Sequence, residues 1–151
     1  MVAYIILDLK SFKDLPAKCF VSNIEKATME SLKNTKINGG KSVLNLQTKK
    51  TDHTGVWTSN QEKIASIGVH VRRSITSHGV AINVCPDLSY LNHFVMCGLP
   101  SSRTTSVEKQ VPGSRTTVQD ISISFVNELA KTLGVNTVER MQLSDLDVDQ
   151  S

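Results

Sequence analysis

Strand-like runs in the middle of the chain restrict the fold more than any other feature. Residues 63–71 and 74–84 both read as strands, and residues 55–58 form another strand that a polar turn at 59–62 joins to the first. Side chains alternate between the two faces of a strand, so Lys63, Ala65, Ile67 and Val69 share one face of the first run. The runs predict a β-sheet at the centre of the fold.

Two glycines lie inside these strand-like runs. Gly68 falls within 63–71, and Gly79 falls within 74–84. Glycine weakens a strand, and it often marks a place where a ligand or another backbone comes close. A β-bulge is the alternative explanation for each of them.

Two segments show helical periodicity on either side of the strands. Residues 15–32 carry apolar side chains at helical spacing, with Asp14 as a possible N-cap and Pro16 in the first turn. Residues 118–133 repeat the pattern, and Thr117 with Asp120 resembles a capping box with Asp in place of Glu. Gly134 suits the C-terminal end of this second helix. The pattern predicts an α/β (α+β) domain with helices packed on a sheet.

The remaining segments complete the predicted organisation. Residues 2–9 read as a core strand, apolar on both faces and already under way at residue 2, and we expect residues to be missing upstream. Residues 34–54 predict a lysine-rich surface loop, either simply solvated or docking an acidic partner. Residues 135–141 predict a short last strand. We expect residues 1–143 to form one domain and 144–151 to form an acidic tail.

Composition narrows the function classes. The chain has 151 residues, 39% hydrophobic and 21% charged, which fits one globular domain. Its net charge of +3 is too small to argue for nucleic acid and is equally compatible with an acidic protein partner. Three cysteines without a C-x-x-C arrangement argue against a disulfide framework. No apolar run approaches the roughly 18 residues that a membrane span needs, and we find no targeting signal.

The candidate chemistry centres on Cys97 and Lys63. A cation beside a cysteine lowers the pKa of its thiol, and the resulting thiolate attacks acyl groups well. Spacing alone leaves other pairs open, because Cys97 could also meet His78 or His93. A zinc site from these two histidines with Cys85 and Cys97 is conceivable, but its spacing matches no common pattern. We expect Cys19, within the first helix, and Cys85, in a turn before Pro86, to be inert.

Several short motifs follow one another in a fixed order along the chain. They are Gly55-Val56-Trp57, the run from Lys63 to Val71, Thr76 with the run from His78 to Asn83-Val84, Asp87-Leu88-Ser89-Tyr90, and Cys97-Gly98. In these motifs the sequence resembles the octanoyltransferase family of protein lipoylation, in particular its fungal mitochondrial members, and the resemblance covers nearly all the chain outside the lysine-rich loop and the tail.

The resemblance implies a fold and a mechanism. The fold would be a mixed sheet flanked by helices, similar to biotin and lipoate protein ligase catalytic domains. An octanoyl group would pass from acyl carrier protein to Cys97 as a thioester and then to a lysine of a lipoyl domain. Lys63 would lower the pKa of the nucleophile and later take a proton from the acceptor amine. The acyl pocket would be lined by Ser66, Ile67, Gly68, Gly79, Val80 and Ala81.

The resemblance also implies partners and a location. The acceptors would be lipoyl domains of 2-oxoacid dehydrogenases and the H protein of glycine cleavage. No metal, nucleotide or other cofactor is expected, since the donor is already a thioester, and neither nucleic acid nor membrane is an expected partner. The location would be mitochondrial, although no transit peptide is visible in this chain.

The chain departs from the family at its start. Members carry an Arg-Gly-Gly segment and a His-Gly-Pro-Gly-Gln segment before the first matched strand, and both wall the substrate site. We therefore expect an N-terminally truncated domain with an incomplete pocket. Alternatives are an inactive fragment, a non-catalytic module that binds a carrier or lipoyl domain, or a related acyl or lipoate transferase on the same fold. An ATP-dependent ligase would need a nucleotide site, and no glycine-rich phosphate loop supports one.

Overall fold

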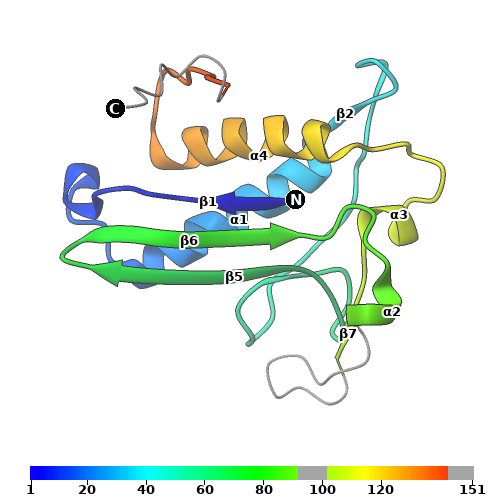
Figure 1. Ribbon diagram of the computed structural model, residues 1–151, viewed down its shortest axis with the longest axis horizontal. Coiled ribbons are helices and arrows are strands. Elements are labelled where there is room, and N and C mark those ends of the chain that lie inside the picture. The colour runs from blue at the N-terminus through cyan, green and yellow to red at the C-terminus, as the bar shows by residue number, and fades with distance from the viewer. Residues whose placement is uncertain (92–101, 143–151) are drawn as a thin grey trace, which may run out of the picture.

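The computed structural model describes residues 1–91 and 102–142 and builds them around a mixed β-sheet (Figure 1). The sheet has the strand order β1-β6-β5-β4, and neighbouring strands on this path are antiparallel. A further strand, β7, pairs with β5 in the parallel sense. The bounds are β1 (Val2–Tyr4), β4 (Val56–Trp57), β5 (Glu62–Arg72), β6 (Ile75–Ile82) and β7 (Arg103–Thr104).

The two longest strands are those that the sequence predicts, and they pair as a hairpin. β5 and β6 pair from Ala65 opposite Ile82 to Arg72 opposite Ile75, which leaves Arg73 and Ser74 as the turn. Both turn residues have positive φ angles, 50° and 69°. Two-residue turns of this kind match the right-handed twist of the strands that they join.

Helices cover one face of the sheet. Helix α1 (Ala17–Asn34) lies behind β5 and β6 in Figure 1, and α4 (Val118–Leu133) packs against α1. The core joins the inner sides of both helices to the strand residues that face them. Its fully or almost fully buried members include Phe20, Ile24, Ala65, Val80, Ile82, Ile121 and Phe125.

Helix α4 has the bounds and caps that the sequence predicts. The Thr117 hydroxyl accepts a hydrogen bond from the backbone N–H of Asp120, and the Asp120 carboxylate accepts one from the backbone N–H of Thr117. Gly134 ends the helix in the left-handed conformation, at φ 72°. The expected capping box and C-terminal glycine are therefore confirmed.

The expectation for residues 2–9 is wrong in length and burial. β1 has only three residues, and the side chains of Val2, Tyr4 and Ile6 are 64%, 72% and 72% exposed. They lie on the face of the sheet that the helices leave uncovered, whereas Ile5 points into the core. A short 3-10 helix, η1 (Leu9–Phe12), follows, and the Asp8 side chain caps it.

Two other local expectations are also wrong. Pro16, and not Asp14, occupies the N-cap position of α1, and no side chain caps that helix end. Asp14 instead has a positive φ of 52°. Residues 135–141 are exposed, and among the described residues they pair with no strand. The expected last strand is therefore absent from this described segment.

The lysine-rich segment is more ordered than a plain surface loop. It contains a small hairpin of β2 (Lys36–Ile37) and β3 (Ser42–Val43), followed by the buried side chains of Leu44 and Leu46. Lys50 forms an ion pair with Glu25 of α1, at 3.0 Å between Nζ and Oε2. The segment therefore contributes to the core, although its remaining lysines are exposed or partly exposed.

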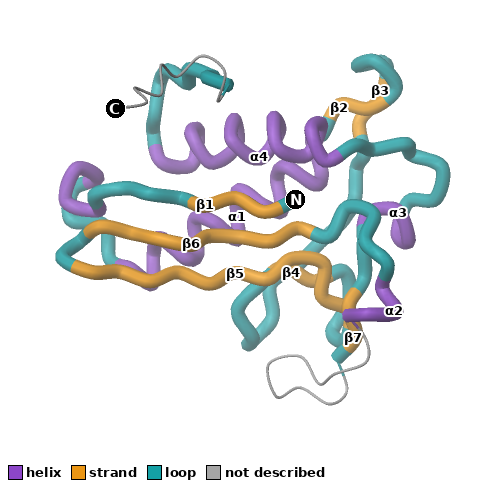
Figure 2. The backbone as a smooth tube through the Cα atoms, in the orientation of Figure 1, coloured by secondary structure: helices purple, strands orange, loops and turns teal. Residues whose placement is uncertain are grey.

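Short elements gather at the end of the sheet opposite the β5–β6 turn. Figure 2 shows β4, β7, α2 (Leu88–Leu91) and α3 (Val107–Gln110) together at this end. Residues 102–114 therefore hold a strand and a helical turn, β7 and α3. Within residues 1–91 and 102–142, no helix is both long and apolar enough to cross a membrane.

Candidate active site

Lys63 occupies a buried position at this end of the sheet. It follows the first residue of β5, pairs with Trp57 of β4, and is only 5% exposed. Its Nζ atom lies 5.3 Å from the centroid of the Trp57 ring, over the ring face. Trp57 is fully buried and donates a hydrogen bond from its indole N–H to the carbonyl oxygen of His53 at 3.1 Å. The ring that carries the cation is therefore itself held in place.

Gly55 forms the other wall around Lys63. Its φ is +127°, and a Cβ built there would collide with Cε of Lys63 and lie 3.1 Å from its Nζ. The same Cβ would lie 2.6 Å from the carbonyl oxygen of Ala65. The backbone N–H of Gly55 donates to the Glu25 carboxylate at 3.1 Å, which ties this wall to α1. Glycine at this position gives the lysine side chain its space.

The charge of Lys63 is not balanced by a neighbouring carboxylate. Within the part of the chain that the structure describes, no Asp or Glu forms an ion pair with Lys63. Burying a cation is costly, and most buried lysines are paired. The attraction between the cation and an aromatic face offsets only part of this desolvation free energy. A buried lysine retained in this way is typical of a functional position.

The strand that follows Cys97 in the sequence, β7, pairs with β5 beside Lys63. Cys97 itself lies outside the described residues, as does His93. The chain re-enters the described part at residue 102, and β7 then pairs Arg103 with Glu62 and Thr104 with Lys63. Thr105 continues the contact, because its backbone N–H donates to the Lys63 carbonyl oxygen at 2.9 Å. The first described strand after Cys97 in the chain therefore pairs beside Lys63.

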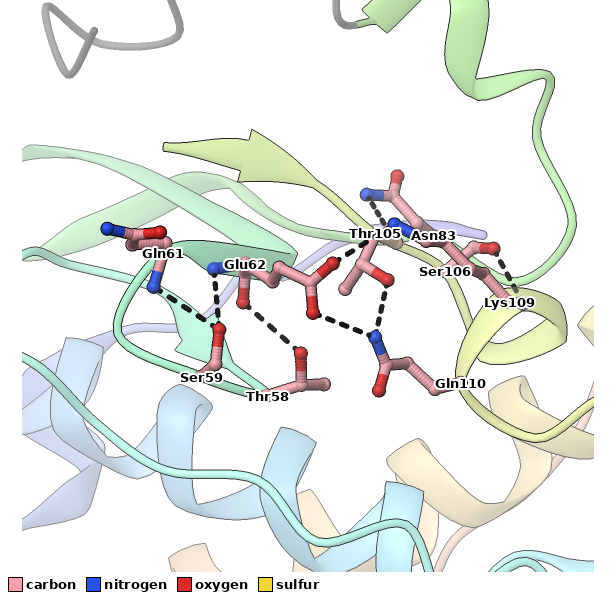
Figure 3. Close-up of polar contacts among 9 residues, drawn as sticks. All are labelled: Thr58, Ser59, Gln61, Glu62, Asn83, Thr105, Ser106, Lys109 and Gln110. Carbon is pink, nitrogen blue, oxygen red and sulfur yellow. Dashed lines mark hydrogen bonds and ion pairs between the residues drawn. The ribbon is translucent and has the colours of Figure 1, made fainter. Parts of the chain in front are cut away.

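A polar network holds this crossing together (Figure 3). Lys109 and Gln110 of α3 both bind the Glu62 carboxylate, at 3.0 Å and 3.2 Å. Gln110 also donates to the hydroxyl of Thr105 at 2.8 Å. The hydrogen bond from Lys109 is the largest influence that lowers the pKa of Glu62, and Gln110 adds to it. The network fixes α3 to the start of β5, next to Lys63.

Asn83 completes the junction from the end of β6. Its backbone N–H donates to Ile64, its side-chain amide donates to the carbonyl oxygen of Thr105 at 3.1 Å, and its carbonyl accepts from Val107. Asn83 therefore connects the chain before the Cys97 segment to the chain after it. Local sequence patterns do not indicate the roles of Glu62, Gln110 and Thr105, because the partners of these residues lie on separate elements.

The expected pocket residues lie side by side in β5 and β6. Ser66 is paired with Ala81, Ile67 with Val80 and Gly68 with Gly79. Val80 is buried toward the helices and Ile67 packs partly against the core, whereas Gly68 is exposed and Ser66 and Ala81 are half-buried. A Cβ at Gly68 would meet nothing within 4 Å, so its face is open. A Cβ at Gly79 would collide with the Ala3 carbonyl oxygen, so this glycine accommodates the β1 backbone.

Of the alternative partners for Cys97, His78 lies away from Lys63, and His93 lies outside the described residues. His78 is exposed, pairs with Val69 and stacks loosely on Tyr4, with ring centroids 6.4 Å apart. Val69 lies six residues further along β5 than Lys63, or about 20 Å. Within the described residues, no group of three or more His, Cys, Asp and Glu side chains could hold a metal ion. Cys19 and Cys85 are exposed free thiols.

Comparisons with solved structures define the fold. The chain superposes on lipoate-protein ligase A bound with ATP with a TM-score of 0.63, at 13% identity, over 95% of this chain and 56% of that one. Biotin protein ligase from Aquifex aeolicus in complex with biotin and ATP also gives 0.63, at 11% identity, over 87% and 48%. The protein therefore has the fold of the biotin and lipoate protein ligase catalytic domains, as predicted.

Sequence comparisons identify the family. The family model "Lipoyl protein ligase A/B catalytic domain" matches residues 1–130, and the chain belongs to this family. It is 62% identical over 149 residues to "Octanoyltransferase, mitochondrial" of Kluyveromyces lactis and 55% identical over 150 residues to the protein of the same name from Saccharomyces cerevisiae. These matches cover 98% of this chain but 45% and 46% of the relatives. The chain thus spans about half the length of the curated relatives that it matches.

Proposed function

We propose that this chain carries the reactive residues of a mitochondrial octanoyltransferase that acts in protein lipoylation. The donor is octanoyl-acyl carrier protein, and the acceptors are lysines of lipoyl domains, including those of 2-oxoacid dehydrogenases and the glycine cleavage H protein. The high identity to yeast proteins of that name supports the activity and the location. The observation that carries the proposal is the position of Lys63, which is buried and forms no ion pair with a carboxylate among the described residues. It lies at the end of β5 that pairs with β7, the first strand described after Cys97.

The proposed reaction has two acyl transfers. The Cys97 thiolate attacks the carbonyl carbon of the donor thioester, and the carrier thiolate leaves and takes up the proton of the Lys63 ammonium. The acceptor amine then attacks the Cys97 thioester, which forms the amide and returns the cysteine. Lys63 favours the thiolate in the first step, and once it has given up its own proton it takes the proton from the acceptor amine in the second. Atoms and charges balance without a metal, a nucleotide or an oxidant.

The sheet face that the helices leave open offers a surface for the acyl chain, while the Lys63 side chain shares the opposite face with Ala65 and Ile67. Gly68 presents no side chain on that face, and Ser66 and Ala81 present small ones. Exposed apolar side chains of Val2 and Tyr4 from the edge strand lie on the same side, in register with Ala81 and Gly79. An eight-carbon chain laid along this face would be removed from water, which is favourable in proportion to the apolar area buried.

Intact mass spectrometry tests the first half-reaction. The purified chain is incubated with octanoyl-acyl carrier protein beside Cys97→Ser and Lys63→Met variants. The proposal expects an octanoyl adduct on the wild type, none on Cys97→Ser, and slower formation on Lys63→Met. An adduct that persists on Cys97→Ser would assign the nucleophile to another residue. Cys19→Ser with Cys85→Ser serves as the matched control, because both thiols are exposed.

A further inference from the structure

Among the described residues, the Trp57 ring is the aromatic side chain that lies against the Lys63 ammonium. Nζ lies 5.3 Å from the ring centroid, within the range at which a cation is attracted to an indole face. Trp57 is fully buried and Lys63 is 5% exposed, so water screens this contact little. The attraction is therefore stronger than for a pair on the surface.

Three restraints fix the ring under the cation. The backbone of Trp57 exchanges hydrogen bonds with Lys49 in both directions, at 2.7 Å and 3.0 Å. Its indole N–H is bound to the His53 carbonyl. The ring therefore has little freedom to follow the lysine, and the lysine must adopt the position that the ring dictates.

Gly55 restricts the lysine from the other side. The missing Cβ leaves the space that Cε of Lys63 fills, and the glycine itself is held by the Glu25 carboxylate. The side chain of Lys63 is thus confined between a ring face and a bare backbone. No carboxylate among the described residues forms an ion pair with the ammonium.

We infer that Trp57 is a positioning residue for Lys63: its ring face fixes the ammonium for the reaction proposed at Cys97, with Gly55 providing the space. The inference rests on the proposed function, because it assumes that Lys63 serves Cys97. A carboxylate in the place of the ring would bind the ammonium tightly and compete with the thiolate. A neutral aromatic face holds the cation without competing for that role.

The chain offers a direct test, because Trp57 is its only tryptophan. Growth of a tryptophan auxotroph on fluorinated tryptophans substitutes this ring alone and nearly preserves its shape. Fluorine withdraws electron density from the ring face and weakens its attraction for a cation. The readout is the pH profile of Cys97 alkylation by iodoacetamide, in a Cys19→Ser and Cys85→Ser background so that a single thiol reacts.

The expected result is a graded shift. Alkylation at neutral pH slows with each added fluorine, by about two- to fivefold for the most fluorinated ring, and the profile moves toward higher pH. Trp57→Leu moves it further in the same direction, and Trp57→Phe moves it less. Phe125→Leu is the matched control, since it removes a buried aromatic ring of α4 and leaves the profile unchanged. Urea unfolding of each variant shows whether the fold is kept.

Lys63→Met separates the two hypotheses. If this variant shifts the alkylation profile and neither fluorination nor Trp57→Leu does, the positioning role of Trp57 is overturned while the role of Lys63 stands. If Lys63→Met itself leaves the profile unchanged, Lys63 does not serve Cys97, and the inference falls together with that part of the proposed function. The fluorinated proteins keep the test decisive even where Trp57→Leu fails to fold.

Discussion

The Nζ atom of Lys63 lies 5.3 Å from the centre of the Trp57 ring, and the two residues are paired across β4 and β5. The register of the sheet therefore determines the contact. Lys63 is also the residue beside which β7 joins β5, so one strand position contacts the aromatic ring, the returning chain and the core.

Replacing Gly55 with alanine should destabilise the fold and displace Lys63. The new methyl would collide with Cε of Lys63 and lie 2.6 Å from the Ala65 carbonyl oxygen, at a φ of +127° that L-residues rarely adopt. We expect a loss of about 2 kcal/mol or more in the free energy of unfolding, measured in urea. Gly39→Ala is the control, because Gly39 also has a positive φ but meets nothing within 4 Å. Equal losses in the two variants would show that the space at Gly55 is not needed.

Removing the positive charge of Lys63 should change the reactivity of Cys97. Lys63→Met keeps the length of the side chain but removes the ammonium, so the thiol loses the cation that favours its thiolate. We expect the pH profile of alkylation to move upward in the background that lacks Cys19 and Cys85. A profile identical to that of the parent would mean that Lys63 and Cys97 do not meet.

The Glu62 network should lose its stabilising effect in acid. Hydrogen bonds from Lys109 and then Gln110 hold the pKa of Glu62 below its ordinary value. A carboxyl with a lowered pKa stabilises the folded state above its unfolded pKa, and this contribution disappears as the pH falls through the folded value. The difference in unfolding free energy between wild type and Glu62→Gln should therefore be constant near neutrality and shrink below about pH 4. A difference that stays flat down to pH 2 would contradict this account.

The capping box of α4 should contribute measurably to stability. Thr117→Ala removes the acceptor for the Asp120 N–H, so the first turn of α4 loses a hydrogen bond. The expected loss is about 1 kcal/mol in urea unfolding. Ser122→Ala on the same helix is the control, because its hydroxyl binds a carbonyl of its own helix and caps nothing. A Thr117→Ala protein as stable as the Ser122→Ala protein would show that the cap is dispensable.

The elements that the sequence predicted well are those whose signals are local. The hairpin of β5 and β6 follows from alternation, and α4 follows from its apolar stripe and from caps that lie within a few residues of its ends. The place of Lys63 on β5 was likewise read from the strand pattern. Its contact with Trp57 could not be derived, because it depends on the register shift between β4 and β5.

The wrong expectations have tertiary causes. Residues 2–9 look like a buried strand because Ile5, Ile6 and Leu7 are all apolar, but β1 lies at the sheet edge with one face uncovered. Asp14 precedes α1 as an N-cap residue would, but Lys13 and Asp14 both have positive φ angles and the N-cap position falls at Pro16. The buried polar run of Thr104, Thr105 and Ser106 looks like a loop, since its partners on β5 and β6 are far away in the sequence.

The most direct measurement of the central claim is an intact mass of the 151-residue chain after incubation with octanoyl-acyl carrier protein. The account predicts a single octanoyl adduct on the wild type that is absent from Cys97→Ser, forms more slowly on Lys63→Met, and transfers to an added lipoyl domain. A folded wild-type chain that acquires no adduct, or an adduct that survives Cys97→Ser, would contradict it.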